Sequence, residues 1–245
     1  MQNVPPRRNQ FDQPIGFDMP EWKAPPFPPR ETLSGRYCRL EPLETGRHAR
    51  DLYEAQSEDR DGRTWTYLFQ GPYSRFEEFE SWCRAAQAAT DKVFFAIVDP
   101  ETGKALGFAS YLRIEPAHGV LEIGHIYYSP RLARTRAATE AMFLFMRQAF
   151  ALGYRRYEWK CDSGNLPSRA AAERLGFTYE GLFRRAIVNK GRNRDTTWFA
   201  IIDEDWKGGL RDAYLRWLDP ANFDARGVQN LRLSELTAPF VHARS

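Results

Sequence analysis

The stretch between residues 121 and 161 constrains the fold of this chain more than any other. Leu121 to Tyr128 is rich in β-branched and aromatic residues and is closed by Ser129-Pro130, so we expect a buried strand that stops at the proline. From Ala138 to Phe150, apolar side chains recur at helical spacing, which predicts a helix with one apolar stripe against a sheet. A second strand is expected at residues 155–161. The stretch therefore predicts a strand–helix–strand unit with parallel strands and a right-handed crossover.

Three arginines, Arg131, Arg134 and Arg136, lie in the turn before this helix. The first turn of a helix presents unpaired backbone N–H groups and the positive end of the helix dipole, so anions bind there readily. The turn is therefore a candidate site for a phosphate-bearing ligand. The alternative is that the three arginines are solvated surface charges, since most exposed charges contribute little.

Four short motifs lie in and after this unit. They are Thr139-Glu140-Ala141 at the helix start, Asn165-Leu166-Pro167-Ser168, Leu175-Gly176-Phe177 and Glu180-Gly181. Together they resemble the GNAT superfamily of acyl-CoA-dependent N-acetyltransferases, specifically its RimJ/RimL-like branch, over residues 36–206. The resemblance implies an α/β (α+β) fold, in which helices flank a mixed, mostly antiparallel central sheet with a splayed parallel strand pair.

The resemblance also implies that acetyl-CoA is the co-substrate. The splayed strand would bind the pantetheine arm through its backbone, and the helix start would bind the pyrophosphate. The residues implied in cofactor binding are Ile126, Tyr127, Tyr128, Arg131, Arg134, Thr135, Arg136, Ala137, Ala138, Thr139, Asn165 and Ser168. The loop departs from the family pattern at Ala133, where Gln or Arg is usual, and at Arg136, which replaces the glycine that lets the backbone approach the pyrophosphate.

Ser168 is the first candidate catalytic residue. In the resembling family this serine is placed to stabilise the leaving thiolate, while the residue matching Asn165 hydrogen-bonds the pantetheine arm. The alternative for both is helix capping, because Asn and Ser are favoured at helix starts and Pro167 suits the first turn.

A base is also expected, because a free amine with a pKa of about 10.4 is protonated at neutral pH. The candidates are Glu122, His125 and Asp195, with Glu122 ranked first and His125 second. Strand alternation places Glu122 and His125 on opposite faces unless a bulge intervenes, so only one of them would face a given site.

The acceptor site is expected under the segment that joins the first two helices. In the resembling family this connection covers the acceptor, and here it carries Trp65, Tyr67 and Phe69 as candidate substrate-binding residues, with Tyr73 close by. The alternative is that these aromatic side chains cap the core.

Three regions are expected along the chain. Residues 1–34 form an arm rich in proline and aromatic residues, packed over the domain or a neighbouring subunit; residues 35–218 form the GNAT-like domain; and residues 219–245 form a C-terminal arm. Within the domain, helices are expected near residues 46–56, 75–89 and 205–218, and strands near residues 35–40, 93–98, 105–114, 177–183 and 196–202.

Composition narrows the remaining possibilities. The net charge is only +3 and no Lys/Arg-rich run occurs, so we do not expect nucleic-acid binding. The cysteines are odd in number and widely spaced, and no C-x-x-C or H-E-x-x-H occurs, so we expect free thiols and no metal site. No stretch approaches the ~20 apolar residues of a membrane span, so we expect a cytoplasmic protein without membrane contact. The sequence is compatible with a homodimer.

The sequence therefore predicts an N-acetyltransferase that moves an acetyl group from acetyl-CoA to a primary amine by direct attack in a ternary complex. The amine would belong to a small molecule or to a protein N-terminus. A non-catalytic acyl-CoA-binding module of GNAT-like fold is the alternative. Nucleotide-binding and hydrolase motifs such as G-x-G-x-x-G, G-x-x-x-x-G-K-[ST] and G-x-S-x-G do not occur.

Overall fold

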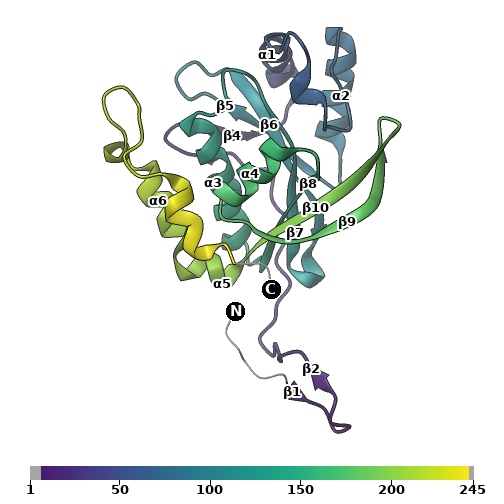
Figure 1. The fold of residues 1–245 in the computed structure, drawn as a ribbon. Helices are drawn as coiled ribbons and strands as arrows, with labels where there is room; N and C mark the ends of the chain where they lie inside the picture. The colour runs from purple at the N-terminus through teal and green to yellow at the C-terminus, as the bar shows by residue number, and fades with distance from the viewer. Residues whose placement is uncertain (1–6, 243–245) are drawn as a thin grey trace.

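The computed structural model describes residues 7–242, which fold around one eight-stranded sheet with the order β3-β4-β5-β6-β7-β8-β10-β9 (Figure 1). Its strands are β3 (Leu33–Ser34), β4 (Arg39–Pro42), β5 (Val93–Val98), β6 (Ala105–Glu115), β7 (Val120–Tyr128), β8 (Arg156–Asp162), β9 (Thr178–Asn189) and β10 (Arg192–Ile202). Neighbouring strands are antiparallel except β7 and β8, which are parallel. The predicted mixed, mostly antiparallel sheet is confirmed.

Helices cover both faces of the sheet. They are α1 (Thr45–Ser57), α2 (Phe76–Ala88), α3 (Arg136–Ala151), α4 (Leu166–Arg174), α5 (Asp203–Asp205), α6 (Arg211–Leu218) and α7 (Leu233–Thr237). α1 and α2 pack together on one face, while α3 and α6 lie on the other (Figure 1). The helix predicted at residues 205–218 is divided between α5 and α6, because Gly209 adopts a φ of 135° in the turn between them.

β5 shows why the sheet has a core on each side. Val93, Phe95 and Ile97 belong to the apolar cluster under α3, whereas the alternating residues belong to the cluster under α1 and α2. Every side chain of this strand is buried, so its sequence is a continuous apolar run without polar alternation.

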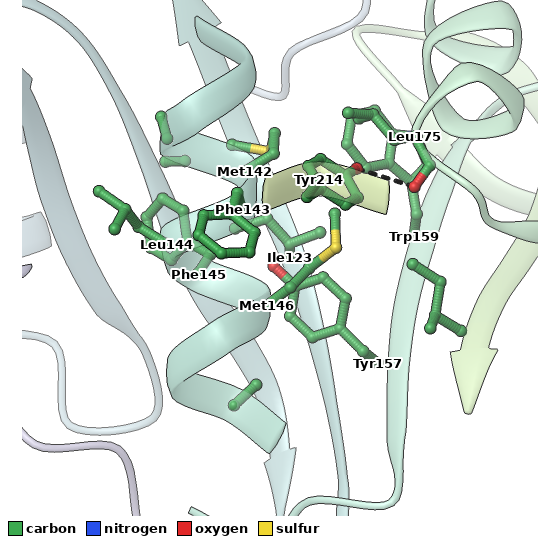
Figure 2. Close-up of a cluster of buried hydrophobic side chains, with 14 of the residues drawn as sticks. Ile123, Met142, Phe143, Leu144, Phe145, Met146, Tyr157, Trp159, Leu175 and Tyr214 are labelled. Atoms are coloured by element: carbon green, nitrogen blue, oxygen red, sulfur yellow. Dashed lines mark hydrogen bonds between the residues drawn. The ribbon is translucent and has the colours of Figure 1, made fainter. Parts of the chain in front are cut away.

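α3 is buried more completely than one apolar stripe predicts. Phe143 and Leu144 fall between the stripe positions, yet both are buried, and the Phe143 ring stacks on Tyr214 of α6 with 5.6 Å between centroids. Tyr214 in turn donates a hydrogen bond of 2.8 Å to the carbonyl of Leu175 (Figure 2). α6 therefore covers the side of α3 that periodicity assigns to solvent.

Glu140 fixes the start of α3 to the strand region before β4. Its buried carboxylate accepts hydrogen bonds from the backbone N–H groups of Arg36, Tyr37 and Cys38 at 2.9, 2.5 and 2.8 Å. A side chain at Gly35 would collide with this carboxylate, since a Cβ there would lie 2.4 Å from its oxygen. This motif residue is therefore a structural clamp.

The N-terminal arm packs along the domain from residue 22 onward. The Trp22 indole donates to the carbonyl of Ala117 at 3.3 Å, and Tyr154 donates to the carbonyl of Pro26 at 3.1 Å. Before this point, the small hairpin of β1 (Arg7–Arg8) and β2 (Pro14–Ile15) projects from the body (Figure 1).

The C-terminal arm also packs against the domain. Leu233 and Thr237 of α7 are buried, and the Thr237 hydroxyl donates to the carbonyl of Arg174 at 3.0 Å. The first six residues of one arm and the last three of the other lie outside the described residues, and the division into arms and a domain stays a prediction. No helix within residues 7–242 is long and apolar enough to cross a bilayer.

Candidate active site

The parallel strands β7 and β8 separate part-way along their length. Their paired register runs only from Val120 opposite Arg156 to Ile123 opposite Trp159, although both strands continue beyond this point. From Gly124 onward, the edge of β7 that faces β8 therefore has no strand partner. Unpaired backbone groups at such an edge need another partner, which a ligand can supply.

A cavity of about 470 Å³ opens at this separation. Its walls come from β7, β8, the start of α4, the segment between α1 and α2, and Arg194 of β10. The predicted site residues that line it are Glu122, His125, Ile126, Tyr128, Asn165, Ser168, Tyr67 and Phe69. The structure thus gathers around one cavity residues that lie about a hundred positions apart in the sequence.

A β-bulge in β7 brings Glu122 and His125 to this cavity together. β7 has one extra residue relative to β6, because Phe108 pairs with Tyr127 while Ser110 pairs with Gly124. His125 takes up the extra length with a φ of 48°. The bulge removes the strict alternation that separates the two side chains, so both candidate bases line the same cavity.

His125 is held as a neutral imidazole. Its Nδ1 lies 2.9 Å from the hydroxyl oxygen of Ser110, and its ring lies against Phe94. Burial, reinforced by the charge of Lys92, lowers the pKa of His125 from 6.5 to about 4. When Nδ1–H donates to Ser110, Nε2 keeps a lone pair that can accept a proton.

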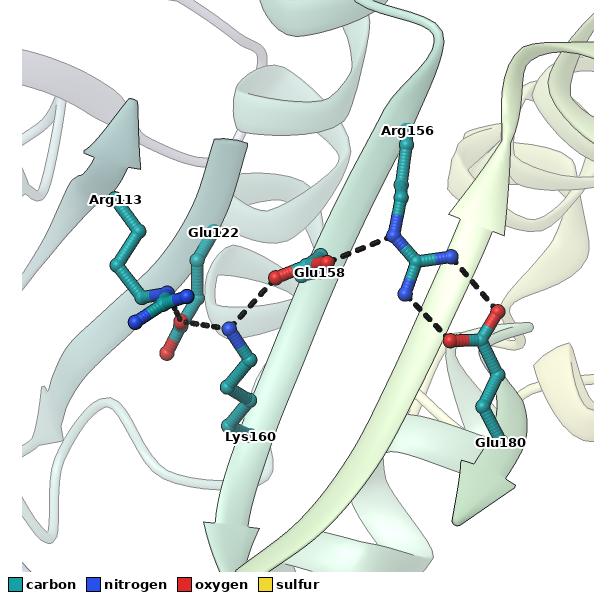
Figure 3. A network of polar contacts seen from close by, with 6 residues as sticks. All are labelled: Arg113, Glu122, Arg156, Glu158, Lys160 and Glu180. Carbon is teal, nitrogen blue, oxygen red and sulfur yellow. Dashed lines mark hydrogen bonds and ion pairs between the residues drawn. The ribbon is translucent and has the colours of Figure 1, made fainter. Parts of the chain in front are cut away.

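Glu122 lies between Arg113 and Lys160 in an ion-pair network that continues through Glu158 (Figure 3). Lys160 bridges two carboxylates, with its Nζ 2.9 Å from Glu122 and 2.6 Å from Glu158. The guanidinium of Arg113 approaches Glu122 at 3.6 Å. Burial raises the pKa of Glu122, and the charge of Lys160 opposes that rise. A buried carboxylate with a raised pKa is a stronger base than an exposed one.

Asn165 and Ser168 have different roles at the start of α4. The Asn165 side chain caps the helix by accepting a hydrogen bond of 3.2 Å from the backbone N–H of Ser168. The Ser168 hydroxyl instead accepts a hydrogen bond of 3.1 Å from the indole N–H of Trp159. Capping therefore describes Asn165 but not Ser168, whose own hydroxyl proton stays available to a group in the cavity.

The start of α3 is capped by Thr135, whose hydroxyl accepts from the N–H of Ala138 at 3.1 Å. Ala138 and Thr139 are buried, and their N–H groups are already bonded to Thr135. Ala137 is partly buried and can offer a ligand mainly its backbone N–H group.

The three arginines of this turn are in different situations. The Arg136 guanidinium lies over the rings of Tyr37 and Phe223, at 4.8 and 4.7 Å from their centroids. Arg131 forms an ion pair of 2.9 Å with Glu58. Arg134 is exposed and, among residues 7–242, forms no ion pair or side-chain hydrogen bond. Arg134 is therefore the arginine of this turn that has no competing partner.

The segment between α1 and α2 includes the short η1 (Arg63–Trp65), and only some of its predicted site residues line the cavity. Trp65 does not line the cavity: its side chain is 1% exposed and stacks on Tyr127 at 4.6 Å, so it caps the core as the alternative interpretation has it. Tyr67 spans the cavity and donates a hydrogen bond of 3.1 Å to the carbonyl of Gly164. Phe69 lines the cavity and is 51% exposed.

Two cationic residues of the cavity, Lys160 and Arg194, were not predicted from the sequence. Lys160 lies two residues after Glu158 in one strand, and that local pattern does not show that Glu122 of another strand pairs with it. Arg194 lies in a run of charged and polar residues that indicates an exposed loop, yet its side chain is 7% exposed. Only the pairing of β8 with β10 places it beside the cavity.

These features agree with a family comparison. The family model described as an acetyltransferase (GNAT) domain matches residues 38–178, more than half of the chain. The chain belongs to the GNAT acetyltransferase family. The resemblance predicted from the Ser168 and Glu140 motifs is thereby confirmed.

Solved structures of other GNAT proteins resemble this one over most of the chain. A GCN5-related N-acetyltransferase from Brucella melitensis is 47% identical with a TM-score of 0.87, and the match covers 90% of this chain and 100% of that one. A GNAT family protein from Chromobacterium violaceum ATCC 12472 is 39% identical with a TM-score of 0.75, covering 80% and 98%.

A more distant GNAT structure shares the fold. It is the acetyltransferase from Salmonella typhimurium that modifies the N-terminal serine of ribosomal protein L7/L12, which is 21% identical with a TM-score of 0.61 over 70% of this chain and 99% of that one. None of the curated proteins that were searched matches this GNAT chain. In the part of the chain that the structure describes, no three His, Cys, Asp or Glu side chains are grouped to hold a metal ion.

Proposed function

We propose that this GNAT protein transfers an acetyl group from acetyl-CoA to a primary amine by direct attack in a ternary complex. The observation that carries the proposal is the unpaired edge of β7, which opens into a cavity where Glu122, His125 and Ser168 converge. A thioester bound along that edge would place its carbonyl between the candidate bases and the serine hydroxyl.

Acetyl-CoA would bind along β7 and over the start of α3. The backbone of Ile126, Tyr127 and Tyr128 offers hydrogen bonds to the pantetheine amides, and this role depends little on side chains: Tyr127 points into the core and Tyr128 donates its hydroxyl to the carbonyl of Ala138. The N–H groups of the first turn of α3 would bind the pyrophosphate. Since Thr135 already accepts the N–H groups of Ala138 and Thr139, the pyrophosphate would use those of Arg136 and Ala137 first.

The side chain at position 136 bears on whether a pyrophosphate can bind there. Arg136 stands where the family has glycine, but its guanidinium is held against the rings of Tyr37 and Phe223. A side chain held in this way supports binding through the backbone and through Arg134, whose charge has no competing partner. Arg131 would have to leave Glu58 to contribute.

The chemistry would proceed in three linked events. Glu122 or His125 accepts a proton from the ammonium, and the free nitrogen attacks the thioester carbonyl carbon. The C–S bond then breaks, and Ser168 donates its hydroxyl proton to the departing sulfur. The serine recovers a proton from the attacking nitrogen, which thereby becomes the neutral amide. Glu122 remains the first candidate base, since burial raises its pKa, whereas burial lowers the pKa of His125 to about 4.

The acceptor class that we propose is a primary amine of a small molecule or of a protein N-terminus. Support for a peptidyl acceptor comes from the Salmonella enzyme of the same fold, which modifies an N-terminal serine. Tyr67 and Phe69 line the outer part of the cavity and would contact the acceptor.

The proposal is tested by following CoA thiol release from acetyl-CoA with a panel of small amines and short peptides. Acetylation should depend on the amine and should be lost without it. If acetyl-CoA binds in a calorimetric titration but no amine releases CoA, the protein is a binding module instead. If no binding is detected at millimolar acetyl-CoA, the acetyltransferase assignment fails altogether.

A further inference from the structure

Arg194 is a buried cation without a counter-ion. Its side chain lines the cavity and is 7% exposed, and its Nε is shielded from solvent with no hydrogen-bond acceptor. Within residues 7–242 it forms no ion pair and donates no hydrogen bond. Its one assigned contact is with the Phe69 ring, whose centroid lies 5.2 Å from the guanidinium carbon.

The carboxylates near Arg194 are engaged elsewhere. Asp195 points away from it and accepts hydrogen bonds from the Arg185 backbone and the Asn193 side chain. Asp162, which lines the same cavity, accepts from the N–H of Gly164 at 2.8 Å.

Leaving a charge in such a position is unfavourable. Burial of an ion costs several kcal/mol unless it is paired, and natural proteins pair such groups almost without exception. Lys160 shows the ordinary solution in this cavity, since it lies between Glu122 and Glu158. Arg194 departs from that pattern, because no residue from 7 to 242 supplies its anionic partner, and a bound ligand can supply one.

The surroundings of Arg194 fit a carboxylate. A guanidinium offers parallel N–H donors that match the two oxygens of a carboxylate, and the Phe69 ring holds its plane in place. Thr196, two residues along β10 and therefore on the same face, has a buried hydroxyl that also lacks a partner. Arg194 lines the cavity together with Tyr67 and Phe69, the residues that we propose contact the acceptor.

We propose that Arg194 binds a carboxylate of the acceptor, so that this enzyme selects primary amines that carry a carboxylate near the reacting nitrogen. This inference rests on the proposed acetyl transfer and specifies its substrate class. The carboxylate could belong to a free amino acid or to an acidic residue close to a peptide N-terminus. Arg194 is then a specificity-determining residue and leaves the acyl-transfer step to the groups on β7 and α4.

Matched pairs of acceptors test the proposal and separate the two sources. One pair is alanine and alaninamide, and the other is an amidated peptide beginning Ala-Glu and its counterpart beginning Ala-Gln. Each is assayed with the wild type and with Arg194→Met, which keeps an unbranched apolar stem and removes the guanidinium with its charge. Arg184→Met is the control, because Arg184 is an exposed arginine of β9 outside the cavity. Since the amines of a pair differ in basicity, the comparison is the change caused by the substitution.

Arg194→Met should lower kcat/KM for the carboxylate member of at least one pair by about tenfold or more. The uncharged member, the KM for acetyl-CoA and all rates of Arg184→Met should stay unchanged. The pair that responds identifies the source of the carboxylate. Equal losses on both members of each pair, or no loss on any, would overturn the proposal.

A stability measurement guards against a merely structural role. Removing an unpaired buried charge should leave the melting temperature of Arg194→Met equal to the wild type or raise it. A clear fall would assign Arg194 to the fold and overturn the inference. If no amine releases CoA, the proposed function fails first, and alanine against alaninamide in a thermal-shift titration still tests Arg194: only the wild type should be stabilised, and only by the carboxylate.

Discussion

Ser168→Ala separates catalysis from helix capping at one position. The variant keeps the cap of α4, because the Asn165 side chain accepts from the backbone N–H of residue 168, which alanine retains. It loses the hydroxyl that accepts the Trp159 indole hydrogen bond. That loss should cost about 1–2 kcal/mol of stability, since the indole N–H is then left without its acceptor.

The effect on turnover should be larger than this stability cost explains. If the Ser168 hydroxyl protonates or stabilises the departing thiolate, kcat should fall by about tenfold or more, while the KM for acetyl-CoA changes little. CoA release under saturating amine measures kcat, and urea unfolding measures stability. Ser163→Ala is a control, because Ser163 lies in the loop just before α4 and does not line the cavity.

Asn165→Ala completes the comparison by removing the cap itself. It should lose about 1 kcal/mol of stability. Should Ser168→Ala keep its kcat within about twofold of the wild type while losing that same stability, the hydroxyl is structural and the assignment of Ser168 is refuted.

Four further predictions follow from the structure. Burial lowers the pKa of His125 from 6.5 to about 4, so between these two pH values the folded state binds fewer protons than the unfolded chain. The contribution of neutral His125 to the free energy of unfolding is therefore complete above pH 6.5 and is lost as the pH falls to 4. Denaturant unfolding at pH 6.5 and pH 4 should show that the free energy of unfolding falls by at most about 3 kcal/mol, and His125→Asn should abolish this fall. An unchanged dependence of the free energy of unfolding on pH in the variant would contradict this. Arg134→Ala should weaken acetyl-CoA binding, and the salt dependence of that binding, more than Arg136→Ala does, because the Arg136 guanidinium is held by two rings. Calorimetric titration at low and high salt measures both effects, and the reverse order of the two variants would contradict this role of Arg134. Phe69→Ala should raise the KM of the acceptor and leave that of acetyl-CoA unchanged, so equal changes in both would exclude a role in acceptor binding. Glu140→Gln should lower the free energy of unfolding by about 2–4 kcal/mol, because it weakens acceptance from three backbone N–H groups, and a loss below about 1 kcal/mol in urea unfolding would refute the clamp.

Local sequence patterns predicted the elements because each depends on neighbours within a few residues. The apolar repeat from Ala138 to Phe150 lies in α3, and the run from Leu121 to Tyr128 lies in β7. Their boundaries follow from Pro130 and Gly153, which act on the backbone directly. The family resemblance extended these elements to the sheet topology. A homodimer, a cytoplasmic location and the absence of nucleic-acid contacts stay predictions.

The geometry of the candidate site depends on contacts between distant parts of the chain. The bulge at His125 arises because β7 is one residue longer than β6 between two pairing points, and no local pattern records that mismatch. Trp65 is buried because Tyr127 stacks on it, although its own neighbours in sequence are polar.

Lys160 and Arg194 of the cavity show most clearly that local sequence patterns do not predict contacts between distant residues. The sequence predicts Lys160 in a strand and Arg194 in a polar loop, each as an ordinary charged residue, whereas β10 of the structure includes Arg194. Whether each is paired, and with what, is set by which strands lie side by side. Lys160 meets Glu122 across the parallel pair, and Arg194 meets no carboxylate of residues 7–242. The sequence by itself determined the secondary structure and family of this protein, because propensity and periodicity are local. The tertiary structure alone decided which charges are buried and unpaired, because burial and pairing are properties of the packed sheet.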